Sequence, residues 1–87
     1  MNIGDDSPVV TLDVRPLLAA GEEPFDVIMA AVAALPPDGI LELTAPFEPV
    51  PLYAVLRARG FEHELRPSSS SVFVVRFFRP RHQGTQT

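Results

Sequence analysis

The sequence predicts an α/β fold, a two-layer α+β sandwich in which two helices cover one face of a four-stranded mixed sheet. Two observations support this order, βαβαββ. Apolar and polar residues alternate in four segments, and apolar residues recur at helical spacing in the two stretches between the first three segments. Each strand–helix–strand unit should cross over right-handed, so the first three strands are parallel and the last hairpin makes the fourth antiparallel.

The first expected strand is "VVTLDVR", residues 9–15, in which Val10, Leu12 and Val14 alternate with Val9, Thr11 and Asp13. Pro16 should close it, because proline cannot donate a ladder hydrogen bond. The following "PLLAAGEE", residues 16–23, is predicted to be a loop whose two leucines fold back onto the edge of the core.

The stretch "GEEPFDVIMAAVAAL", residues 21–35, predicts the first helix. Its apolar face consists of Phe25, Ile28, Met29, Val32 and Leu35. Pro24 suits the first helical position, where its missing N–H costs nothing, and the acids before and after it complement the positive end of the helix dipole. The opposite face is small (Ala30, Ala31 and Ala34), which would let a second helix or another subunit approach closely.

The middle of the chain predicts a strand and a second helix. "ILELTA", residues 40–45, alternates as a strand, and the helix should run from about Val50 to Arg59 with Pro51 in its first turn. Gly60 is placed to end this helix in a left-handed conformation, with Phe61 making the apolar contact that accompanies such an ending.

The last two strands should form a hairpin. "FEHELR", residues 61–66, and "VFVVRFFR", residues 72–79, flank "PSSSS", which predicts the loop. The inward residues of the last strand are expected to be Phe73, Val75 and Phe77. Its other apolar residues, Val72, Val74 and Phe78, would lie on the open sheet face and could form a homodimer or partner surface.

Composition limits the possible functions. The chain has 87 residues, enough for one domain over 9–79 between a disordered lead (1–8) and a frayed tail (80–87). A net charge of −4 disfavours nucleic acid or an anionic membrane as partner. Without cysteine, disulfides and thiolate chemistry are excluded. No apolar run is long enough for a membrane span and the start does not resemble a secretory signal, so a cytoplasmic location is expected.

The segments "LDVR", "EEPFDVIMAAVAALPPDGILEL" and "APFEPVPLYAVLRARGFEHEL" together resemble the TusA/SirA/YedF-like superfamily over roughly residues 9–79. The likeness is greatest to its cysteine-less branch, a domain of unknown function, and it implies a TusA/SirA-like fold. In the sulfur carriers of that superfamily, a Cys-Pro-x-Pro motif opens the first helix. Here its cysteine falls on Gly21, its first proline on Glu22 and its second on Pro24, so the resemblance implies no persulfide chemistry.

Ligands of open α/β sheets favour the loops beyond the carboxyl ends of the parallel strands. The residues expected at this rim are Asp13, Arg15, Gly21, Glu22, Glu23, Phe47 and Glu48. They predict a shallow acidic pocket with one arginine, suited to a basic partner, a cation or a polar small molecule. The alternative is purely structural: acids that stabilise helix starts, with Arg15 paired to one of them.

Other candidate sites are weaker. In "EHE", residues 62–64, the histidine of a strand points away from both acids, so no metal site is expected. The basic residues at the opposite rim, Arg57, Arg59, Arg79 and Arg81, favour helix C-termini and a solvated tail over a nucleic-acid surface. Ser68 to Ser71 have no evident general base. We expect no cofactor.

Three functions remain. The first is a small non-catalytic module that binds a protein partner or polar small molecule through the rim or the open sheet face. The second is an enzyme or carrier with non-cysteine chemistry that uses Arg15 with Glu22 or Glu23, although exposed helix-start carboxylates seldom have the shifted pKa that this needs. The third, an RNA-contacting domain, is disfavoured by the acidic balance and by the absence of lysine.

Overall fold

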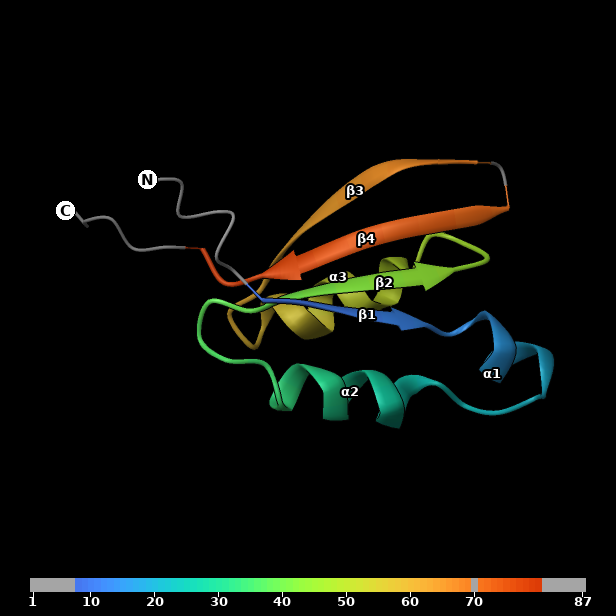
Figure 1. The fold of residues 1–87 in the computed structure, drawn as a ribbon, viewed down its shortest axis with the longest axis horizontal. Coiled ribbons are helices and arrows are strands. Elements are labelled where there is room, and N and C mark those ends of the chain that lie inside the picture. The colour runs from blue at the N-terminus through green and yellow to red at the C-terminus, as the bar shows by residue number, and fades with distance from the viewer. Residues whose placement is uncertain (1–7, 70, 81–87) are drawn as a thin grey trace, which may run out of the picture.

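The computed structural model describes residues 8–69 and 71–80. It contains four strands and three helices, shown in Figure 1. In chain order they are β1 (Val9–Asp13), α1 (Arg15–Ala19), α2 (Phe25–Ala33), β2 (Ile40–Ala45), α3 (Val50–Arg57), β3 (Glu62–Ser69) and β4 (Val72–Phe78). Most of the lead and tail predicted for residues 1–8 and 80–87 lies outside the described residues.

The sheet is mixed, as predicted. Its strand order is β1-β2-β4-β3, with β1 parallel to β2 and with β4 antiparallel to both of its neighbours. In Figure 1, α2 runs alongside β1 and α3 lies behind the central strands. Because both crossovers begin at the carboxyl ends of β1 and β2, the starts of α2 and α3 lie at the same edge of the sheet.

The core lies between the helices and one face of the sheet. The alternation of β2 buries Leu41, Leu43 and Ala45, and the register pairs the first two with the fully buried Phe77 and Val75 of β4. Ile28, Val32 and Leu56 close the core from the helices. Of the inward residues predicted for the last strand, Val75 and Phe77 are buried as expected, and Phe73 is half-buried.

The open face of the sheet is more polar than expected. The half-buried Val72, Val74 and Phe78 lie on it, but an ion pair between Arg76 Nε and Glu42 Oε2, 2.9 Å long, stands in its centre. Apolar residues therefore do not form one continuous patch across this face.

The connection predicted as a loop over residues 16–23 contains a helix, α1, and β1 ends at Asp13 rather than at Arg15. Pro16 does not close the strand but lies in the first turn of α1, where its restricted φ suits a helix. The helix ends in a Schellman motif, in which Gly21 N–H donates to Leu18 C=O (3.0 Å) and Glu22 N–H donates to Leu17 C=O (2.9 Å). Gly21 adopts φ 77°, the left-handed conformation that this ending requires.

The hairpin loop predicted over Pro67 to Ser71 is shorter in the structure. β3 continues to Ser69, with a register irregularity between Arg66 and Ser69. Proline and serine disfavour a central strand, but β3 is an edge strand, where a missing N–H can face solvent.

The predicted ending of α3 at Gly60 and Phe61 is confirmed, although the regular helix ends at Arg57 and not at Arg59. Gly60 N–H donates to Arg57 C=O (2.9 Å), Phe61 N–H donates to Leu56 C=O (2.9 Å), and Gly60 has φ 91°. Phe61 is buried in the core beside this turn, and the Arg79 guanidinium lies 4.5 Å from the centre of its ring.

This ending predicts the effect of two substitutions at Gly60. Gly60→Ala should lower the free energy of unfolding by about 1–2 kcal/mol, because a Cβ disfavours the left-handed conformation. Gly60→Asn should cost less, since asparagine tolerates this conformation better. Urea unfolding followed by far-UV circular dichroism measures both changes, and an alanine variant as stable as the parent would contradict this account of the turn.

Candidate functional site

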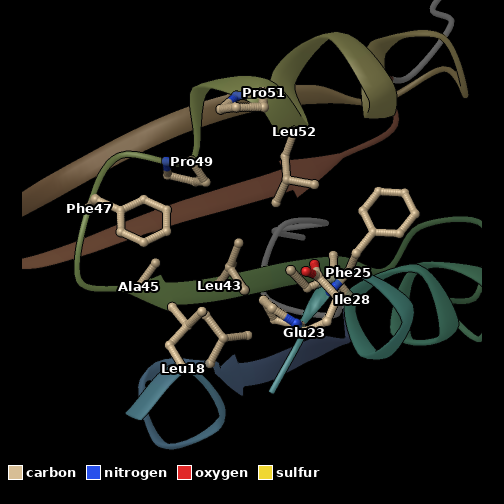
Figure 2. Close-up of a pocket in the computed structure, with 12 residues that line it drawn as sticks. Leu18, Glu23, Phe25, Ile28, Leu43, Ala45, Phe47, Pro49, Pro51 and Leu52 are labelled. Atoms are coloured by element: carbon tan, nitrogen blue, oxygen red, sulfur yellow. The ribbon is translucent and has the colours of Figure 1, made fainter. Parts of the chain in front are cut away.

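A pocket with a cavity volume of about 200 Å³ opens at the carboxyl end of β2, where α1, α2 and α3 converge (Figure 2). Leu43 and Ala45 of β2 form its floor. Its walls come from the junction of β1 and α1 (Val14), α1 itself (Leu18), the start of α2 with the residues before it (Glu23, Pro24, Phe25 and Ile28) and the start of α3 with the residues before it (Phe47, Pro49, Pro51 and Leu52).

Local sequence explains why there is space here. Ala45, the last residue of β2, is buried but contributes only a methyl group to the floor. On one side the chain enters α2 through Pro24, and on the other it enters α3 through Pro49 and Pro51. These prolines fix the backbone where the helices diverge from the sheet, so the gap above Ala45 is not filled by main chain.

The two helix starts offer few hydrogen-bond donors to a ligand. Proline has no N–H, and it occupies the N-cap of each helix and also the first turn of α3. The Phe25 N–H already donates to Glu23 Oε2 at 3.2 Å. An exposed helix N-terminus normally attracts anions through its free N–H groups. Here prolines remove some of those groups, and the Glu23 carboxylate accepts another.

The mouth of the pocket combines aromatic rings with negative charge. Phe25 and Phe47 are 41% and 52% exposed although both line the cavity. Glu23 lies at the same mouth, next to exposed Glu22 and close in sequence to exposed Asp26. Chemically, the site can hold an apolar group inside and a cationic group at its mouth.

Of the residues predicted for the rim, Glu23 and Phe47 line this pocket, and the other five are not among its lining residues. Gly21 and Glu22 are exposed in the turn between α1 and α2, where Gly21 serves the ending of α1. The predicted lining was acidic, whereas Glu23 is the single polar side chain among the 12 lining residues.

Asp13 and Arg15 form a separate, exposed pair. Arg15 Nε lies 2.9 Å from Asp13 Oδ1 and Arg15 Nη2 lies 2.7 Å from Asp13 Oδ2, a two-point contact, and the Arg15 N–H also donates to Oδ1 at 3.0 Å. The side-chain hydrogen bonds from Arg15 hold the pKa of the Asp13 carboxyl below its usual value. The pair thus fixes the junction of β1 and α1, and the arginine is paired with this aspartate rather than with Glu22 or Glu23.

Glu48 belongs to a cluster beside the pocket. Its carboxylate accepts a hydrogen bond of 3.0 Å from the Tyr53 hydroxyl of α3, and the Tyr53 ring stacks on His63 of β3 with 3.6 Å between ring centroids. Burial, assisted by the Glu48 carboxylate, raises the pKa of Tyr53 to about 12. His63 points towards the helices while Glu62 and Glu64 face the other way, which confirms the orientation expected for "EHE".

Sequence reasoning did not place Val14, Leu18, Ala45 or Leu52 in a site. Leu18 reaches the pocket only because residues 15–19 form a helix, and the signal for that helix was Pro16 followed by Gly21 at the distance of one short helix. An alanine at the end of an otherwise bulky buried strand was a second available signal.

In the described part of the chain, no group of three or more histidine, cysteine, aspartate or glutamate side chains is arranged to hold a metal ion. Within residues 8–69 and 71–80, no helix has the length and apolar character needed to cross a membrane.

Comparison with known proteins gives a family but no characterised relative. The family model described as "Uncharacterized conserved protein (DUF2249)" matches residues 11–79, most of the chain. No curated protein and no solved structure matches it. The expected membership of a family of unknown function is confirmed. The relationship to the TusA/SirA superfamily stays a prediction.

The raised pKa of Tyr53 can be measured directly, because the chain has one tyrosine and no tryptophan. Absorbance at the tyrosinate band should titrate near pH 12 in the folded protein and near pH 10 in denaturant. Since the folded pKa is the higher one, this contribution to stability is intact below about pH 10 and is lost as the pH rises towards 12.

Glu48→Gln separates the two causes of this shift. It should lower the midpoint of Tyr53 but leave it above the value in denaturant, because burial is the larger cause. Circular dichroism at each pH confirms that the chain is still folded. A folded Glu48→Gln variant in which Tyr53 keeps the parent's titration midpoint would contradict the Tyr53–Glu48 hydrogen bond. A folded variant that titrates at the midpoint measured in denaturant would contradict burial as the larger cause.

Proposed function

Because the chain belongs to the DUF2249 family of uncharacterised conserved proteins, we propose its function from the pocket itself: it is a non-catalytic binding module that receives one apolar side chain of a partner protein. The observation that carries this proposal is the lining, in which Glu23 is the single polar side chain among 12 residues. Such a surface binds by removing apolar area from water, which needs no reactive group.

The size of the pocket supports a side chain rather than a larger ligand. Sites for drug-sized molecules usually measure roughly 300–1,000 Å³, whereas an apolar cavity of about 150 Å³ already holds benzene. The present volume of about 200 Å³ therefore suits one leucine, methionine or phenylalanine side chain. Protein interfaces commonly depend on a few such anchors seated in apolar pockets.

The charge at the mouth favours a basic neighbour beside the anchor. Glu22, Glu23 and Asp26 are exposed at the start of α2, and the chain as a whole carries a net charge of −4. Complementary charge at the rim of an interface mainly accelerates association and selects partners. The best-fitting segment has an apolar residue flanked by arginine or lysine.

The alternative of non-cysteine catalysis has less support. It required Arg15 to act with Glu22 or Glu23, but the Arg15 guanidinium makes a two-point contact with Asp13. The Glu23 carboxylate accepts the Phe25 N–H, a role that stabilises the start of α2. Glu23 is the one carboxylate among the lining residues, and no second polar side chain of the lining stands beside it to act with it.

The resemblance to sulfur carriers fits this proposal only at the level of position. The carrier cysteine would fall on Gly21, three residues before Pro24, which lines the pocket. Gly21 has φ 77°, a conformation in which a cysteine would be strained. We therefore propose that this chain uses the same end of the fold for binding through apolar contacts instead of sulfur transfer.

Selection of peptides tests the proposed ligand class. Random peptides displayed on phage and selected on the purified protein should converge on an apolar anchor beside arginine or lysine. Ala45→Met fills the floor of the pocket and should raise the dissociation constant of a selected peptide at least about 30-fold, the loss of one interface anchor. Fluorescence anisotropy with a labelled peptide measures this change.

The matched control is Ala54→Met, the same substitution at an exposed position of α3, which should leave the affinity unchanged. Thermal unfolding of both variants shows whether the fold tolerates the larger side chain; if Ala45→Met unfolds, Leu18→Trp narrows the pocket from the opposite wall. Peptides without an apolar anchor, or equal binding by a folded filled variant, would overturn the proposal.

The rim charge gives a second, kinetic prediction. Glu23→Gln should slow association of a basic selected peptide several-fold at low salt and weaken the salt dependence of the association rate, with little change in dissociation. Stopped-flow measurements at two ionic strengths separate these effects. An unchanged association rate with faster dissociation would place Glu23 in direct contact with the anchor instead.

A further inference from the structure

β1 is an edge strand of the sheet whose first four residues include no charge and no proline. Among the described residues, β1 and β3 are the edge strands of the sheet, and each has one strand neighbour. β1 has no charged residue before Asp13, and its Val9 and Val10 are 47% and 40% exposed. Edge strands expose free N–H and C=O groups that readily pair with another chain unless charges, prolines or bulges prevent it.

The other edge has these protections. β3 carries Glu62, Glu64 and Arg66, contains Pro67, and has the register irregularity that precedes Ser69. The two edge strands of the sheet therefore differ. The residues of β3 disfavour pairing with a further strand, whereas those of β1 do not.

Helix α2, which packs beside β1, extends this apolar side of the molecule (Figure 1). After Asp26 this helix has no polar residue. Val27 is 39% exposed, and Ala30 and Ala33 are exposed as well. A helix that is apolar all round is normally buried on all sides. The exposed faces of α2 and β1 thus suit a covered environment.

We propose that a second copy of the chain covers this side, with the two β1 strands paired antiparallel about a two-fold axis at Thr11. The hydrogen bonds fix which residues face the edge. Ile40 N–H donates to Pro8 C=O (2.8 Å) and Val14 N–H donates to Thr44 C=O (3.0 Å). In a parallel ladder the bonds to one neighbour fall on alternate residues, so Val9, Thr11 and Asp13 direct their N–H and C=O groups outward.

The alternation of outward-directed residues, Val9, Thr11 and Asp13, selects one symmetric register. With Thr11 opposite Thr11 of the partner subunit, Val9 lies opposite Asp13 of the partner subunit, and all three outward residues exchange hydrogen bonds across the axis. On the helix-covered face, Val10 then lies opposite Leu12 of the partner subunit. These are the closer, non-hydrogen-bonded positions of the ladder, which favour apolar pairs.

Charge also favours a second copy over an unrelated strand. The acids Glu22, Glu23 and Asp26 lie at the start of α2, whereas Arg79 lies near its other end, with Nη1 3.2 Å from Pro36 C=O. Antiparallel pairing turns the acidic end of one subunit towards the basic end of the other. It also runs the two α2 dipoles in opposite directions, which is the favourable arrangement.

Light scattering after size exclusion tests the assembly over a concentration series. The expected mass at high concentration is twice the 9.5 kDa of one chain. Thr11→Lys would place two lysines face to face on the axis and should raise the dimer dissociation constant at least about tenfold. Ala54→Lys, an exposed change on α3, should leave it unchanged. A parent protein that stays monomeric throughout would overturn the proposal.

Cross-linking tests the register independently of stability. The chain has no cysteine, so Thr11→Cys introduces a single thiol that a short bis-maleimide should join rapidly to its symmetry mate. Ser71→Cys, exposed next to β4, should not react between subunits at the same rate. Equal cross-linking of both variants would overturn the Thr11 axis.

Because Thr11 does not line the pocket, Thr11→Lys should keep peptide binding, which separates this proposal from the proposed function.

Discussion

The direction of the two crossovers is the constraint on which the rest of the structure depends. Because β1 and β2 are parallel and each is followed by a crossover, α2 and α3 begin at the same edge of the sheet. Residues from both helix starts surround the carboxyl end of β2. In this chain that strand ends in Ala45, so the gap above it stays open as a pocket.

The same edge is where many α/β proteins bind phosphate or other anions, because free N–H groups of helix starts point into it. Here prolines stand at these positions, and the carboxylate of Glu23 takes the Phe25 N–H. The residues at these helix starts are the reason that we propose an apolar ligand with a basic neighbour for this edge, and not an anion.

Much of the fold could be predicted from the sequence, because alternation and helical spacing are strong signals over segments such as residues 40–45. The ending of α3 at Gly60 and Phe61 was equally clear, since one glycine and one aromatic residue suffice for it. The short helix α1 was missed because five residues are too few to show periodicity. Without α1, Leu18 could not be placed, and the rim was expected to be more acidic than the pocket is.

The distribution of exposed apolar side chains connects the two proposed surfaces. A chain of 87 residues leaves a large share of its surface exposed, so scattered apolar residues alone would mean little. They are not scattered here but form two groups. Phe25, Phe47 and Val50 lie at the pocket or next to it. Val9, Val10 and Val27 lie on the β1–α2 side, and Leu65 on β3 lies apart from both groups. The first group surrounds a concave site for one side chain, whereas the second includes a strand edge with unpaired backbone groups. A concave apolar site selects a partner by the shape of its anchor, and a strand edge selects it by register, so the two surfaces are suited to different occupants.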